Sequence, residues 1–226
     1  MINGYTPYSG NQNTCYVKGE SGTFYPGVRI ENVSYPLTIS SVQAAVCSCL
    51  ANSDNPVEYY TGDHQPELLQ VWADEYDMKP GGKLPDSPLK LFDPLVPSIP
   101  DIKKELDVLT EKSVTPNSGF PVSALLQTEK GYIRGVNIEL SSWALGLCAE
   151  RVAISRALTA GYTQFKSIHI YAPEADFVSP CGACRQVLLE VMPDADTELY
   201  HGDGTLSKHI VSDLLPFGFT SHKLKK

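Results

Sequence analysis

Three cysteines and one glutamate in the second half of this 226-residue chain have the types and spacing needed for metal chemistry. Cys148 and Glu150 lie in the run CAE, and Cys181 and Cys184 lie in PCGAC. Two cysteines three apart at the start of a helix place both sulfurs on one face, and a helix N-terminus favours thiolates. Three thiolates suit zinc, and three protein ligands leave a fourth position open for water. The pattern predicts a catalytic zinc site with Glu150 as the proton carrier.

A zinc ion that only stabilises the fold is the alternative for the same cysteines. Such a site normally takes a fourth Cys or His at short spacing. His169, His201 and His209 are available, but none of them sits in a ligand-like pair. The ligand count therefore favours the catalytic site.

The elements that must position these residues can be read from hydrophobic periodicity and turn signals. Helices are expected over 101–112, 148–161 and 181–193, with Asp101 as the N-cap of the first. Residues 122–127 and 132–140 predict a hairpin, 167–172 and 197–202 predict strands, and 207–216 predicts a short closing helix. Helices that alternate with strands after a hairpin indicate a mixed sheet between helical layers.

The first half of the chain repeats this pattern in shorter form. GVRIE begins at Gly27 and GVNIE at Gly135, an offset of 135 − 27 = 108 residues, and TPYSG at Thr6 matches TPNSG at Thr115. Several matches in the same order indicate a duplication. We expect one unit over 1–95 and a second over 96–226, with the Pro- and Gly-rich residues 79–100 as an irregular end and linker.

The first unit has neither CxE nor PCxxC, and Gln43 stands near the position of the catalytic glutamate. An amide cannot carry protons as a carboxylate does, so we expect a degenerate unit without zinc. Its cysteines, Cys15, Cys47 and Cys49, could form a separate metal site. Because free cysteines are so often buried, we expect small buried side chains instead.

The runs CAERVA and SPCGACRQVLLE, together with SGFPVSALLQ, GVNIE and DLLPFGF, resemble the zinc-dependent cytidine deaminases. The resemblance implies an α/β fold of two units, each a mixed sheet sandwiched between helices in three layers. It implies one zinc ion per chain and hydrolytic deamination of cytidine and deoxycytidine to uridine and deoxyuridine, a step of pyrimidine salvage. Deamination of another cytosine nucleoside, such as blasticidin, and a non-catalytic zinc-binding protein are the alternatives.

The resemblance also assigns roles to single residues. Cys148, Cys181 and Cys184 would bind zinc, and Glu150 would activate water and protonate the ring nitrogen and the leaving ammonia. Asn137 and Glu139 would bind the ribose, and Phe120 would pack on the nucleoside. Arg151 would donate hydrogen bonds to the cysteine sulfurs. From the residues alone, Glu150 could be a helix-start acid, Asn137 and Glu139 the exposed face of an edge strand, Phe120 a core residue and Arg151 a surface residue. The chain departs from the family at Asn117, Ser123 and Leu140, where Tyr, Gly and Asn are usual.

The two-unit organisation resembles the dimeric cytidine deaminases, which implies a homodimer. In the related enzymes the aromatic residue after the GVxIE strand reaches into another unit's site, and its counterpart here is Tyr35. We expect Tyr35 of one chain to line the nucleoside pocket of the partner chain. The alternative is that Tyr35 fills an interface within its own chain.

Composition limits the classes of partner. A net charge of −8 and a pI near 5.1 argue against a nucleic-acid partner but leave a small neutral substrate open. No apolar run approaches the roughly 20 residues that span a bilayer, and the N-terminal residues show no signal-peptide pattern. We therefore expect a cytoplasmic enzyme that binds neither nucleic acid nor membranes.

Overall fold

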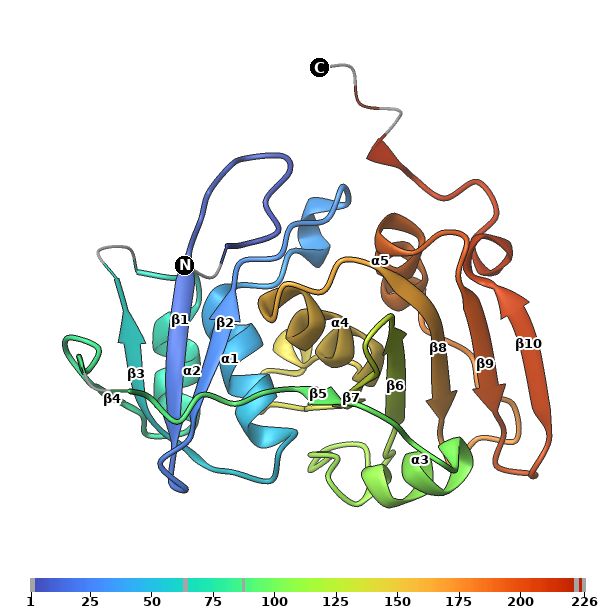
Figure 1. The fold of residues 1–226 in the computed structure, drawn as a ribbon, viewed down its shortest axis with the longest axis horizontal. Coiled ribbons are helices and arrows are strands. Elements are labelled where there is room, and N and C mark those ends of the chain that lie inside the picture. Colours follow the sequence, from blue (N-terminus) through green and yellow to red (C-terminus); the bar gives the residue numbers. More distant parts are fainter. Residues whose placement is uncertain (1–2, 63–64, 87, 222–223, 225–226) are drawn as a thin grey trace.

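The chain folds into two mixed β-sheets that lie side by side and are flanked by helices (Figure 1). The structure, a computed structural model, describes residues 3–62, 65–86, 88–221 and 224. The first sheet has the strand order β2-β1-β3-β4, formed by β1 (Thr14–Gly19), β2 (Phe24–Val28), β3 (Pro56–Thr61) and β4 (Lys79–Pro80). Its helices are α1 (Ser41–Leu50) and α2 (Leu69–Glu75), and a 3-10 helix, η1 (Tyr35–Leu37), precedes α1.

The second sheet has six strands in the order β10-β9-β8-β6-β7-β5. The strands are β5 (Leu95–Val96), β6 (Ser123–Thr128), β7 (Tyr132–Val136), β8 (Phe165–Tyr171), β9 (Asp196–Tyr200) and β10 (Leu206–Ile210). The helices are α3 (Ile102–Thr110), η2 (Trp143–Leu145), α4 (Ala149–Thr159), α5 (Gly182–Val191) and η3 (Val211–Leu214). Strands β8 and β9 are parallel and the other neighbours antiparallel, so the predicted α/β class with mixed sheets is confirmed.

Helices cover both faces of the second sheet. Asp101 caps α3 as expected, because its carboxylate accepts a hydrogen bond from the Lys104 N–H at 3.0 Å. On β6, the Ser123 hydroxyl donates to the Leu106 carbonyl of α3 at 2.7 Å. The neighbouring residue, Ala124, points to the opposite face and pairs with Gly135, which lies against α4. The sheet therefore separates α3 from α4, the helix that begins at the cysteine motif.

The predicted closing helix over 207–216 is wrong. Residues 206–210 form β10, which pairs antiparallel with β9, and only Val211–Leu214 is helical. Asp203 and Gly204 make the turn, with Gly204 at φ +86°. An Asp-Gly pair is a strong hairpin signal, and the sequence interpretation overlooked it.

The linker is more regular than predicted. Residues 79–100 contain β4, which pairs with the first sheet, and β5, which pairs antiparallel with β7 of the second. Between them the Phe92 N–H donates to the Phe24 carbonyl of β2 at 2.9 Å. The linker therefore runs along the edges of both sheets, and the expected boundary at residue 95 falls inside β5.

The two units share local geometry at equivalent positions. A Cβ atom on Gly27 would lie 2.2 Å from the Ser41 carbonyl of α1, and one on Gly135 would lie 2.2 Å from the Ala149 carbonyl of α4. Only glycine lets the strand approach the helix this closely, which explains why both copies carry the glycine of GVxIE. The same offset of 108 pairs the N-cap residues Ser40 and Cys148.

This equivalence corrects one sequence alignment. Counting from the paired N-caps, Val42 lies at the position of Glu150, and Gln43 lies at the position of Arg151. Gln43 is thus the counterpart of the arginine and not of the glutamate.

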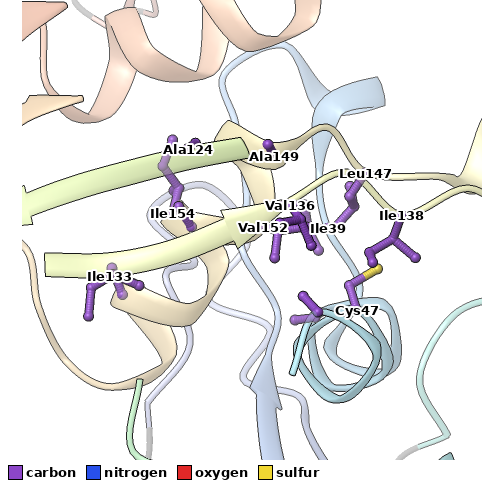
Figure 2. Packing of buried hydrophobic residues seen from close by; sticks show 14 of the residues in the cluster. Ile39, Cys47, Ala124, Ile133, Val136, Ile138, Leu147, Ala149, Val152 and Ile154 are labelled. Atoms are coloured by element: carbon purple, nitrogen blue, oxygen red, sulfur yellow. The ribbon is translucent and has the colours of Figure 1, made fainter. Parts of the chain in front are cut away.

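The hydrophobic core is continuous between the units. Figure 2 shows Ile39 and Cys47 of the first unit in one cluster with Val136, Ile138 and Leu147 of the second. The interface also buries Arg156 of α4, which donates to the Ser48 hydroxyl and carbonyl of α1 and to the Arg134 carbonyl. Within the described residues, no helix combines the length and apolar character needed to cross a membrane.

Candidate active site

The three predicted cysteine ligands come together at two helix starts. Cys148 is the N-cap of α4 and Cys181 the N-cap of α5, with Cys184 in the first turn of α5. Their sulfur atoms all lie within 4.8 Å of one another, and this is the one such group of potential metal ligands in the described part of the chain. Cys15, Cys47 and Cys49 are fully buried and lie outside it, as predicted.

The spacing and ionisation of these sulfurs fit a zinc ion. Two sulfurs bound tetrahedrally at 2.3 Å from zinc would lie about 3.8 Å apart, and the sulfurs of Cys148 and Cys181 are 3.7 Å apart. A hydrogen bond from Cys148 holds the pKa of Cys181 well below its usual range, whereas hydrogen bonds among the sulfurs raise the pKa values of Cys148 and Cys184. Thiolates at these positions would carry the negative charge that a divalent cation complements.

Glu150 lies beside the sulfurs and lines a cavity. Its side chain is 3% exposed, and burial raises its pKa to about 7. A carboxyl group with such a pKa can both accept and release a proton near neutral pH.

Arg151, the next residue, points toward the first unit. Its guanidinium donates to the Leu37 carbonyl at 2.9 Å, while its Nε is buried without a hydrogen-bond partner in the described structure. The hydrogen bonds to the sulfurs that the resemblance implies remain a prediction. The alternative of a freely exposed surface arginine does not fit these contacts.

The cavity beside the cysteine cluster has a volume of about 520 Å³. Its lining includes the predicted residues Phe120, Asn137, Glu139, Cys148 and Glu150. Cys181 also lines it, so the cysteine cluster and the proposed ribose-binding pair share one cavity. The elements β6, β7, α4 and α5 thus bring together residues that are spread over positions 120–181 of the sequence.

The proposed ribose-binding residues are ordered by the loop that precedes β6. Asn137 donates to the Phe120 carbonyl and accepts from the Val122 N–H, both within 2.9 Å. Glu139 accepts from the N–H groups of Asn117 and Ser118 and from the Ser118 hydroxyl. Although burial alone would raise the pKa of Glu139, these hydrogen bonds lower it, so the side chain is an anion that can accept from hydroxyl groups.

Phe120 and Tyr35 are both exposed, in different settings. Phe120 is 38% exposed and lines the cavity, which argues against a core role. Tyr35 is 84% exposed in η1 and is absent from the lining of its own chain's cavity. The alternative that Tyr35 fills an interface within the chain is therefore wrong, and its placement in a partner's pocket stays a prediction.

The departures Ser123 and Leu140 point away from the cavity. Ser123 is fully buried against α3, and Leu140 is 1% exposed in the core. Neither lines the cavity, so these substitutions change the support of the sheet and not the wall of the pocket.

Two aromatic residues of the pocket wall were missed from the sequence. Trp143 in η2 and Phe177 before α5 both line the cavity and are 66% exposed. The Phe177 ring stacks on His201, whose Nδ1 accepts from the Val178 N–H at 2.9 Å. Trp143 could have been found, since it lies 143 − 35 = 108 residues after Tyr35; Phe177 carried no signal.

Comparisons with known proteins agree with this geometry. Residues 102–195 match the family model described as the cytidine and deoxycytidylate deaminase zinc-binding region. A cytidine deaminase of Halalkalibacterium halodurans is 41% identical over 124 residues, which cover 54% of this chain and 93% of that protein. A blasticidin-S deaminase of Bacillus cereus is 32% identical over 126 residues, covering 51% of this chain and 89% of that protein.

Among solved structures, the crystal structure of a cytidine deaminase from Burkholderia pseudomallei is 37% identical, with a TM-score of 0.49 over 51% of this chain and 94% of that one. The relatives thus match about half of this chain over nearly their whole length. The 41% identity to a cytidine deaminase over 93% of its length, together with the family-model match and the thiol cluster, shows that the chain belongs to the cytidine deaminase family.

Proposed function

We propose that this protein is a zinc-dependent cytidine deaminase that converts cytidine and deoxycytidine to uridine and deoxyuridine, with release of ammonia. The observation that carries the proposal is that Cys148, Cys181 and Cys184 form one cluster, and that two of its members, Cys148 and Cys181, line the same cavity as Glu150. Asn137 and Glu139 line the same cavity, where a nucleoside's sugar hydroxyls would find an amide and a carboxylate.

The residues of the chain would act as follows. Zinc held by the three cysteines, one ion per chain, would supply the Lewis acid that activates a water molecule. Glu150 would take one proton from this water and deliver it to the ring nitrogen. It would then transfer the second proton, from the hydroxyl group now bonded to the ring carbon, to the amino group, which leaves as ammonia. The water oxygen becomes the new carbonyl oxygen, and the C–N bond to the amino group breaks. Phe120 would pack on the nucleoside, and Arg151 would offset the charge of three thiolates.

Blasticidin deamination is the second candidate, because a blasticidin-S deaminase is among the relatives. Asn137 and Glu139 favour an ordinary nucleoside, since both would hydrogen-bond to a ribose. Competition between cytidine and blasticidin in one assay separates the two substrates by their ratio of kcat/KM.

We further propose a homodimer in which units 1–95 and 96–226 have different roles. The first would be a degenerate deaminase unit, and its Tyr35 would pack near the sugar in the partner's pocket. The 84% exposure of Tyr35 supports a partner that covers it. A Tyr35→Ala protein that stays dimeric and zinc-loaded should show a raised KM; unchanged kinetics in that dimer would exclude this contact. A fragment of residues 101–226 should be inactive or poorly folded.

Six free cysteines, three of them in a zinc-binding cluster, fit a reducing compartment. On this ground we place the enzyme in the cytoplasm, in pyrimidine salvage.

The test of the proposed function is Glu150→Gln assayed beside the wild-type protein. Wild type should convert cytidine, followed by loss of its absorbance, while Glu150→Gln should bind as much zinc and lose nearly all turnover. Wild-type rates in the variant would exclude the role of Glu150. No turnover by zinc-loaded wild type would instead favour the non-catalytic zinc protein.

A further inference from the structure

The turn that carries Trp143 is held at both ends by the first unit. At one end, Gln43 Nε2 donates to the Leu145 carbonyl at 2.7 Å. At the other end, Glu75 Oε1 accepts from the Ser141 N–H at 2.9 Å, and its second oxygen accepts from the Ser141 hydroxyl. Trp143 lies between these two anchored points and lines the cavity. We name residues 141–145 the Trp143 turn.

The same contacts recur in the opposite direction. Arg151 donates to the Leu37 carbonyl, and Glu190 accepts from the Val33 N–H at 2.7 Å. Leu37 and Val33 precede Leu145 and Ser141 by the same 108 residues. Each unit therefore holds the corresponding turn of the other, but only the turn in the second unit forms part of a cavity with the cysteine cluster.

The identity of residue 43 fits this task. Arg151 lies in the first turn of the helix capped by Cys148, a member of the cysteine cluster. The first unit has Ser40 at the position of Cys148, and its described residues contain no such cluster. Gln43 is 6% exposed, and a buried cation without a counter-charge would be costly there. An amide keeps the N–H that reaches the carbonyl and removes the charge.

From these contacts we infer that Gln43 and Glu75 are positioning residues for the nucleoside pocket: they form a clamp in the same chain that fixes Trp143 against the cavity. The inference rests on the proposed function insofar as a nucleoside occupies that cavity. It gives the degenerate unit a task within its own chain, separate from any contact that Tyr35 makes with a partner.

The kinetic test uses paired variants. Gln43→Met and Glu75→Leu remove the hydrogen bonds at near-constant size, and Glu75→Gln keeps an acceptor for the Ser141 N–H. Gln43→Met should raise KM for cytidine roughly fivefold to tenfold, as expected for one lost hydrogen bond to a partly buried group. Glu75→Leu removes two exposed hydrogen bonds and should raise KM by a similar factor. Zinc content and kcat should stay near wild type, and Glu75→Gln should recover most of the wild-type KM.

The control is Leu50→Ala, at the far end of the helix that carries Gln43. Leu50 is 7% exposed in the core, so this variant lowers the melting temperature without touching the Trp143 turn. A KM that rises equally in Leu50→Ala, or stays unchanged in Gln43→Met and Glu75→Leu, overturns the inference.

A second measurement needs no substrate. The chain has two tryptophans, Trp72 and Trp143, so fluorotryptophan labelling gives two fluorine NMR signals, which Trp72→Phe assigns. The Trp143 signal should shift or broaden in Gln43→Met, while the signal of the fully buried Trp72 stays in place. An unchanged Trp143 signal would overturn the clamp, whatever the enzyme's substrate. Absence of cytidine turnover in wild type with a shifted Trp143 signal would refute the proposed function alone.

Discussion

Gly135→Ala should displace the helix that carries the site, because β7 touches α4 at this glycine. The added Cβ would lie 2.2 Å from the Ala149 carbonyl oxygen, 2.7 Å from the Ala153 nitrogen and 2.9 Å from the Ala153 Cβ. Two of these atoms are backbone, so no side-chain rotation relieves the overlap. Regaining ordinary contact needs a shift of roughly 1 Å, and overpacking of this kind costs about 3 kcal/mol.

The displaced residues are those next to Cys148, the N-cap of α4. Metal sites tolerate ligand displacements of about 0.2 Å, so Gly135→Ala should lose zinc as well as stability. The assay is zinc content per chain after gel filtration, together with urea unfolding.

The duplication supplies the matched control. Gly27→Ala creates the same overlap against α1, with distances of 2.2 Å to the Ser41 carbonyl oxygen and 2.4 Å to the Ala45 nitrogen. It should lose a similar amount of stability, about 3 kcal/mol, and keep its zinc. Wild-type zinc content in Gly135→Ala, or equal zinc loss in both variants, would refute the reasoning.

Three further predictions concern stability. Asp101→Ala removes the cap of α3 and should cost about 1 kcal/mol, measured by thermal unfolding. Ser123→Gly removes the hydrogen bond to the Leu106 carbonyl and should lower stability by about 1 kcal/mol while KM stays unchanged, since Ser123 lies outside the cavity. Burial would raise the pKa of Asp54, but hydrogen bonds from Ser21, Tyr25 and the Asn55 N–H outweigh it and lower the pKa. The stability that Asp54 contributes is therefore present above its unfolded pKa of about 4 and is lost as pH falls through its folded pKa. In Asp54→Asn, the urea concentration at the unfolding midpoint should fall less on acidification than it does in wild type.

Local signals in the sequence were sufficient to predict features that depend on a single helix, strand or contact. The cap at Asp101, the apolar spacing in α3 and the glycines of GVxIE each act within one element or one contact, and the structure contains them. The cysteine cluster was equally accessible, because CxxC and CxE place their side chains at helix starts. The hairpin of β9 and β10 was missed because the apolar residues of 207–216 also fit a helix.

Contacts between the units were not accessible in this way. Gln43 binds a backbone carbonyl 102 residues away in sequence, and Glu75 binds a backbone N–H 66 residues away. These backbone groups are common to nearly all residue types, so they leave no signal in the sequence. Phe177 joins the pocket because His201, on the turn after β9, supports its ring. These positions depend on how the two sheets are packed, which periodicity within one element does not specify.

The most direct test of the central claim is the titration of metal-free protein with zinc while cytidine turnover is followed. The account predicts that activity rises in proportion to zinc and saturates at one ion per chain, and that Cys148→Ala neither binds the ion nor turns over. Full activity in metal-free protein, or saturation at two ions per chain with both needed, would contradict a single catalytic site in the second unit.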